Sequence, residues 1–138
     1  NLSRKEIRER VMEKLEALGV SAAAHKLPAQ LSGGMQKRVA VARAMILESE
    51  ILIDDEPTTG LDPITTEMVD DLIVQAEEMF GVTSIVISHD MASVVRIADY
   101  LSFLHTGEIA ASGTVEQLLR SDHPATAEFV RASRISLD

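Results

Sequence analysis

One short stretch decides the class of fold: Ile51-Leu52-Ile53-Asp54-Asp55-Glu56-Pro57. It begins with three aliphatic residues, two of them β-branched. Such a run favours a buried strand, because strands covered on both faces are apolar without alternation. The acidic residues and the proline that follow end the apolar run, so the predicted strand carries carboxylates at its carboxyl end.

Helix and strand signals alternate around this strand. Ser3 followed by Glu6 predicts a capping box, Gly19 predicts a helix end, and Asp62-Pro63 predicts an N-cap with the first helical residue. The expected elements are helices over residues 3–18, 33–47, 62–79 and 91–97, strands over 51–53 and 83–88, a hairpin of 101–105 with 108–111, and two short helices after 114 and 124. This alternation predicts an α/β layered sheet.

Composition and charge exclude several classes of function. Of the 138 residues, 46% are hydrophobic and 25% are charged, as in ordinary globular domains. The net charge of −9 argues against a general nucleic-acid-binding protein, although Gln36-Lys37-Arg38 stays a candidate for a local basic patch. The chain has no cysteine, no apolar run long enough to span a membrane and no signal-peptide pattern at its first residues. We expect a soluble cytoplasmic chain that reaches a membrane only through a partner.

The strongest motif is Leu31-Ser32-Gly33-Gly34-Met35-Gln36-Lys37-Arg38, at the start of a predicted helix. Two adjacent glycines let a ligand approach the backbone closely, and the amides at a helix N-terminus attract an anion. The hydroxyl of Ser32 adds a further donor. A plainer interpretation is a Gly-Gly loop with a serine cap, and for this motif alone it is about as well supported as a ligand-binding loop.

The carboxylates at the end of the 51–53 strand are the second signal. An aspartate followed by a glutamate suits a magnesium-nucleotide site, where one carboxylate holds the metal through water and the next activates the attacking water. Clustered carboxylates also raise one another's pKa, which helps one of them to accept a proton. The alternative is a solvated acidic turn.

Two weaker motifs follow. Residues 58–62, Thr-Thr-Gly-Leu-Asp, taken alone indicate only that Asp62 caps a helix. Ser88-His89-Asp90 places a histidine at the end of the second strand, where such a residue is more often structural than catalytic. The other histidines have no motif around them and are interpreted as structural: His25, His105 and His123.

Together, in this order and spacing, the four motifs resemble those of the ATPase subunits of ATP-binding-cassette (ABC) transporters. Residues 31–36 resemble the signature motif, 51–56 the Walker B strand, 60–62 the D-loop, and His89 the switch histidine. The resemblance extends over nearly the whole chain. It implies an α/β fold, namely a partial P-loop NTPase core with a helical signature subdomain. Residues 1–48 would form that subdomain with the signature helix, and residues 49–138 would form the C-terminal part of the catalytic core.

The resemblance also implies the role of each motif in binding ATP and Mg²⁺. Glu56 would be the general base for water, Asp55 the magnesium-side carboxylate acting through water, and His89 a contact to the γ-phosphate. The signature residues would contact ATP held by the opposite subunit of a head-to-tail homodimer, and Asp62 would lie across that interface. The residues implied to bind nucleotide are Leu31, Ser32, Gly33, Gly34, Gln36 and Asp62.

Within the family, Met35 and Lys37-Arg38 make the chain look most like the ATPases of MCE-type (Mla-like) phospholipid transporters, which are linked to solvent tolerance. That resemblance implies an integral-membrane permease as partner, a periplasmic MCE-type lipid-binding protein beyond it, and a peripheral location on the cytoplasmic face of the inner membrane. It implies no nucleic-acid partner.

Two features depart from the family pattern. The sequence contains no G-x-x-x-x-G-K-[ST] motif, so we expect the Walker A strand and the N-terminal β-subdomain to be missing. We therefore expect the chain to be a C-terminal portion that is inactive alone. Asp54 stands where the family has an apolar or aromatic residue. It would lie at an exposed strand end, pair with a cation or be neutral.

Two other functions stay open. A non-transport ABC protein acting on DNA or the ribosome would usually carry long insertions or basic linkers, whereas the helix over residues 3–18 leads into the signature loop after only about a dozen residues. A regulatory module that does not hydrolyse ATP is supported only by the missing P-loop.

Overall fold

The computed structural model describes residues 2–135, and these form two compact units. The first unit is Asn1–Ile87 and the second is Ser88–Asp138. The boundary lies at the end of a strand rather than near residue 48. The functional division of this chain into residues 1–48 and 49–138 stays a prediction.

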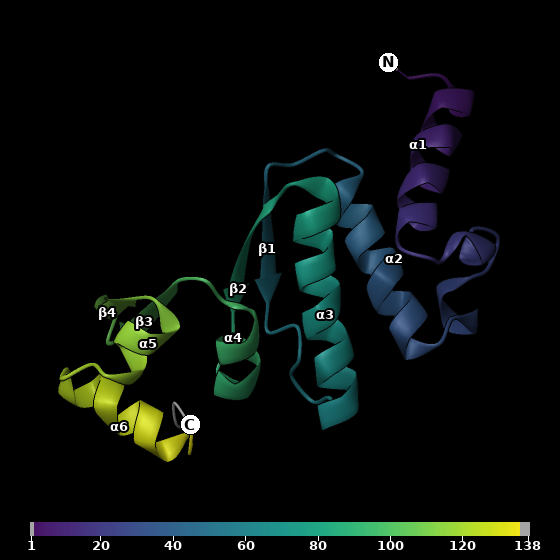
Figure 1. Ribbon diagram of the computed structural model, residues 1–138. Helices are drawn as coiled ribbons and strands as arrows, with labels where there is room; N and C mark the ends of the chain where they lie inside the picture. Colours follow the sequence, from purple (N-terminus) through teal and green to yellow (C-terminus); the bar gives the residue numbers. More distant parts are fainter. Residues whose placement is uncertain (1, 136–138) are drawn as a thin grey trace. The chain divides into compact units, whose positions relative to one another are not determined.

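The first unit contains the elements that carry the predicted signature and Walker B motifs (Figure 1). In chain order these are α1 (Arg4–Ala17), the 3₁₀ turns η1 (Ser21–Ala23) and η2 (Pro28–Gln30), α2 (Gly33–Met45), β1 (Ile51–Asp55), α3 (Pro63–Phe80) and β2 (Thr83–Ile87). The predicted helices and strands are all found, with ends shifted by one or two residues. The segment 20–30, expected to be irregular, contains the two 3₁₀ turns.

The two strands of this unit pair in parallel, with α3 as the crossover between them. The register runs from Ile51 opposite Thr83 to Asp55 opposite Ile87. β1 therefore continues two residues beyond the aliphatic run that predicted it, because β2 still offers ladder partners there. The pair of strands with its crossover helix confirms the α/β class.

The two faces of the sheet differ in exposure. Leu52 is buried on one face, whereas Ile53 on the other face is 64% exposed and its register partner Ile85 is 48% exposed. Successive side chains of a strand point to opposite faces, so β1 and β2 present a row of isoleucines away from the buried side. Sheets of parallel strands are usually covered on both faces, and this face is apolar enough to be covered.

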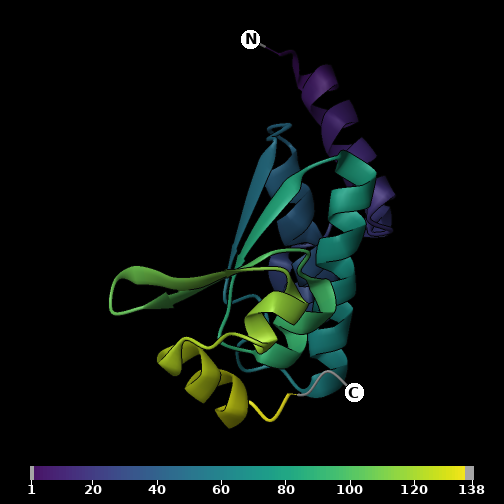
Figure 2. The same cartoon turned by 60° about the vertical axis from the view of Figure 1, so that its left-hand side comes forward.

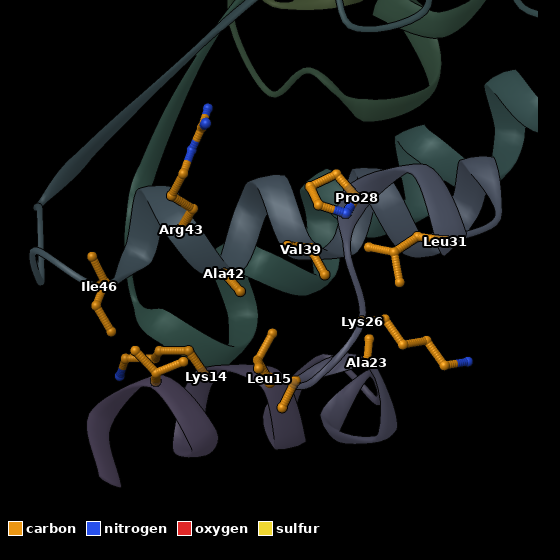
Figure 3. Close-up of a pocket in the computed structure, with 12 residues that line it drawn as sticks. Lys14, Leu15, Ala23, Lys26, Pro28, Leu31, Val39, Ala42, Arg43 and Ile46 are labelled. Carbon is orange, nitrogen blue, oxygen red and sulfur yellow. The ribbon is translucent and has the colours of Figure 1, made fainter. Parts of the chain in front are cut away.

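The helical part of the first unit has its own apolar core. Leu15 and Leu18 at the end of α1 pack with Ala42 of α2 and Leu72 of α3. Beside this core lies an apolar cavity of about 310 Å³ between α1 and α2 (Figure 3). The charged ends of Lys14, Lys26 and Arg43 lie at its rim and point away from its centre.

As far as residue 135, the second unit is a hairpin with three helices (Figure 2). Its elements are α4 (Met91–Ile97), β3 (Leu101–His105), β4 (Glu108–Gly113), α5 (Val115–Leu119) and α6 (Pro124–Ala132). The antiparallel pairing of β3 with β4 confirms the predicted hairpin, and Thr106 and Gly107 turn the chain with φ of 50° and 84°. The rings of Phe103 and Phe129 lie 5.0 Å apart and join α6 to the hairpin.

None of the helices in residues 2–135 combines the length and the apolar character that crossing a membrane requires.

Candidate functional site

The signature loop forms the N-terminus of α2. Ser32 is the N-cap, and its hydroxyl accepts a hydrogen bond from the backbone N–H of Met35 at 3.3 Å. Gly33 and Gly34 are the first helical residues, so their amides belong to the set that has no partner within the helix. The structure thus contains the serine cap of the plainer interpretation, at a helix N-terminus of the kind that attracts anions. Contact of this loop with a nucleotide stays a prediction.

Packing inside the unit does not explain the two glycines. A Cβ added at Gly33 meets no described atom within 4 Å, and one at Gly34 meets only the Met68 methyl at 3.8 Å, an ordinary contact. Neither glycine has a positive φ. The backbone at both positions is therefore open to close approach by another molecule.

The three polar side chains after the loop hold α2 to three other segments. Gln36 donates from Nε2 to the carbonyl oxygens of Pro28 and Leu31 at 3.1 and 3.2 Å. Lys37 donates from Nζ to the Pro57 carbonyl at 3.1 Å, and Arg38 donates to the Leu18 carbonyl at 3.3 Å. The two cations that suggested a basic patch therefore bind backbone oxygens. The role of Gln36 in nucleotide binding stays a prediction.

Glu56, the predicted base, lies in a left-handed turn just after β1. Its φ is 50°, a conformation that costs a non-glycine residue free energy and persists only where neighbours hold it. Its N–H donates to the Ile87 carbonyl at 2.8 Å, and Thr59 donates from Oγ1 to its carboxylate oxygen Oε2, also at 2.8 Å. The sequence did not predict this contact of Thr59, although a separation of three residues from Glu56 is typical of a turn.

The two aspartates before Glu56 have different surroundings. Asp55 is exposed at the end of β1, where the metal-side carboxylate was predicted. Asp54 is half-buried, and its Oδ2 has no hydrogen-bond partner within residues 2–135. Burial raises the pKa of Asp54, and the negative charge of Glu77 raises it further. Of the three states left open for Asp54, these surroundings favour the neutral one.

The segment after Glu56 leads into α3. Thr58 is buried, Gly60 turns the chain with φ of 74°, and the Leu61 N–H donates to the Thr58 carbonyl at 3.1 Å. Asp62 caps α3 by accepting at Oδ1 from the N–H groups of Ile64 and Thr65 at 3.0 and 3.1 Å. The side-chain and backbone hydrogen bonds from Thr65 lower the pKa of Asp62. The cap that the sequence predicted is confirmed.

Comparison with known proteins identifies the family. The family model described as ABC transporter matches residues 2–59. The intermembrane phospholipid transport system ATP-binding protein MlaF of Haemophilus influenzae is 43% identical over 91% of this chain and 47% of its own length. The chain belongs to the ABC transporter family.

Other members of the ABC transporter family are nearly as similar. The methionine import ATP-binding protein MetN of Caulobacter vibrioides is 42% identical over 91% of the chain and 38% of its own length. The structure of cbiO1 from Clostridium perfringens, part of the ABC transporter complex cbiONQ, matches 99% of the chain and 53% of its own chain with a TM-score of 0.78 and 31% identity. The chain thus spans about half the length, or less, of these relatives.

His89, the predicted switch histidine, belongs to the second unit. Its side chain is exposed, and the residues on either side of it build the start of α4. Ser88 accepts at Oγ from the Asp90 N–H at 3.0 Å, and Asp90 caps α4 by accepting at Oδ1 from the Ala92 N–H at 3.1 Å. His105 stacks on Phe103 in the hairpin with centroids 6.3 Å apart, in keeping with its structural interpretation.

Proposed function

We propose that the whole protein is the ATP-binding and ATP-hydrolysing subunit of an ABC transporter. The observation that carries the proposal is a helix N-terminus with two glycines that internal packing does not require, in the same unit as a strand-end glutamate in a strained turn. The first feature suits contact with a phosphate and the second suits activation of water. Family membership supports the same assignment.

Each residue has a distinct task in this function. Glu56 accepts the proton of the attacking water, and the Thr59 hydroxyl, which donates to Oε2, fixes the orientation of its carboxylate. Magnesium commonly uses one or two carboxylates together with substrate phosphates, so the adjacent Asp55 and Glu56 suit it, with Asp55 holding the ion through water. The ion would neutralise phosphate charge during transfer.

The site is completed by a second subunit. Ser32, Gly33 and Gly34 would contact the γ-phosphate of ATP held by the other subunit of a head-to-tail homodimer, with Asp62 at the interface. The chain has no G-x-x-x-x-G-K-[ST], so the P-loop would come from another part of the whole protein. His89 would contact the γ-phosphate in its own subunit.

We further propose phospholipid as the transported substrate. The printed name of the MlaF relative and the residues Met35 and Lys37-Arg38 support it. The partners would then be a membrane permease and a periplasmic MCE-type lipid-binding protein, with the ATPase on the cytoplasmic face of the inner membrane. MetN, at 42% identity, supports import of a small solute as the second candidate. ATPase activity of the reconstituted transporter, compared with added phospholipid and with added methionine, separates the two.

Exchange of Glu56 for glutamine tests the ATPase assignment. In the whole protein Glu56→Gln should leave ATP binding intact and lower the hydrolysis rate by about a hundredfold or more, because glutamine cannot take the proton. Glu78→Gln, an exposed residue of α3, is the matched control. Turnover of Glu56→Gln within a few-fold of wild type would remove Glu56 from this role.

A further inference from the structure

One side chain joins the signature helix to the turn that holds Glu56. Lys37 lies in the first turns of α2, and its Nζ donates to the carbonyl oxygen of Pro57 at 3.1 Å in a partly buried position. Pro57 directly follows Glu56 in the chain. A charged donor makes a stronger hydrogen bond than a neutral one, and partial burial protects it from screening by salt.

The turn that receives this bond has little freedom of its own. Glu56 is held in the left-handed region, its N–H is tied to Ile87, and Thr58 is buried. Pro57 has a fixed φ. Few freely rotating backbone bonds therefore separate the Pro57 carbonyl from Glu56.

The signature helix is held equally firmly at its start. Gln36 binds the Pro28 and Leu31 carbonyls, and Arg38 binds the Leu18 carbonyl, so the neighbours of Lys37 fix α2 to the segments on its other sides. Gly33, Gly34 and Lys37 lie in the same first turns of α2, so these turns connect the amides of the two glycines directly to Lys37.

We propose that Lys37 is a positioning residue that couples the two ATP sites of the dimer. This inference rests on the proposed function, in which the signature loop contacts ATP on the partner subunit and Glu56 acts on ATP in its own subunit. When the loop engages the partner's phosphate, Lys37 transmits the shift of α2 to Pro57 and sets the carboxylate of Glu56. Occupation of one site then controls hydrolysis at the other.

Substitution of Lys37 in the whole protein tests the coupling. Lys37→Met keeps the aliphatic stem and removes the donor, and Lys37→Arg restores a charged donor. We expect Lys37→Met to lower kcat about tenfold, the effect of losing one charge-assisted hydrogen bond, and to reduce the Hill coefficient for ATP towards 1. The affinity of the isolated subunit for nucleotide should stay within twofold, and Lys37→Arg should recover most of both losses. Lys26→Met, at the rim of the cavity between α1 and α2, is the control and should match wild type.

The outcomes separate this inference from the proposed function. A wild-type protein without ATPase activity contradicts the proposed function. A wild type that hydrolyses ATP and loses activity in Glu56→Gln, with kcat and Hill coefficient unchanged in Lys37→Met, contradicts only the coupling. A Hill coefficient of 1 for ATP in wild type also contradicts the coupling. If Lys37→Met does not fold, Lys37→Leu, which also has no donor, takes its place, and kcat and the Hill coefficient decide in the same way.

Discussion

Replacement of Asp54 should make the protein more stable at neutral pH. The carboxylate lies on the same side of β1 as buried Leu52, beside a hollow of about 260 Å³ that Val69, Leu72 and Ile73 also line. Its Oδ2 has no hydrogen-bond partner among the described residues. Asp54→Leu removes this unpaired oxygen and places a methyl-bearing side chain where the hollow offers room.

The size of the effect follows from burial. An unpaired polar group costs about 1–3 kcal/mol when it is fully buried, and the half-buried Asp54 belongs at the lower end of that range. We expect Asp54→Leu to raise the free energy of unfolding by about 1 kcal/mol at pH 7. In domains of about 150–250 residues, a change of about 1 kcal/mol corresponds to a rise of roughly 2–4 °C in Tm.

The pH dependence has a definite sign. Because burial raises the pKa of Asp54 in the folded protein, the unfolded chain loses this proton at a lower pH than the folded protein does. Stability from this group is therefore complete below the ordinary aspartate pKa and falls as pH rises through the folded pKa. Asp54→Asn, which carries no titrating proton, should remove this part of the pH dependence while gaining less stability than Asp54→Leu.

Urea unfolding of the whole protein between pH 4 and pH 8 measures both effects. Asp55→Asn is the matched control, because Asp55 is the next residue of β1 and is exposed. The reasoning is refuted if Asp54→Leu lowers the free energy of unfolding at pH 7. It is also refuted if Asp54→Asn keeps the wild-type slope of stability against pH.

Two further predictions concern the loops of the proposed site. Gly34→Asp should abolish ATP-driven dimerisation, measured by sedimentation, and leave the subunit's own nucleotide affinity nearly unchanged, because a Cβ at Gly34 fits inside the subunit with its nearest contact at 3.8 Å. Equal loss of both would mean that the loop serves its own subunit's site. Asp62→Ala should speed amide exchange at Ile64 and Thr65, whose N–H groups Asp62 caps. The pKa of Asp62 is lowered in the folded protein. The ionised cap therefore contributes its full stability above the ordinary aspartate pKa, and this stability is lost as pH falls through the lowered pKa. Unchanged amide exchange in Asp62→Ala would contradict the capping role.

The sequence by itself determined the helix starts and the order of the motifs. The capping box of Ser3 with Glu6 and the Asp62 cap of α3 form as predicted. The Ser32 cap of α2, which the sequence left as the plainer interpretation of its motif, forms as well. Each joins groups two or three residues apart, so the local sequence contains every atom that takes part. The α/β class was predictable for a related reason, since two aliphatic strands joined by a helix form a parallel pair with few alternatives.

Only the tertiary structure decided how these pieces act on one another. Lys37 reaches Pro57 and Arg38 reaches Leu18, each across twenty residues, and no local pattern distinguishes these cations from an exposed basic patch. The side of β1 on which Asp54 lies, and hence the direction of its pKa shift, depends on which face α2 and α3 cover. Contacts between distant segments form only once the helices pack on the sheet, because packing rather than local hydrogen bonding fixes which side chains meet.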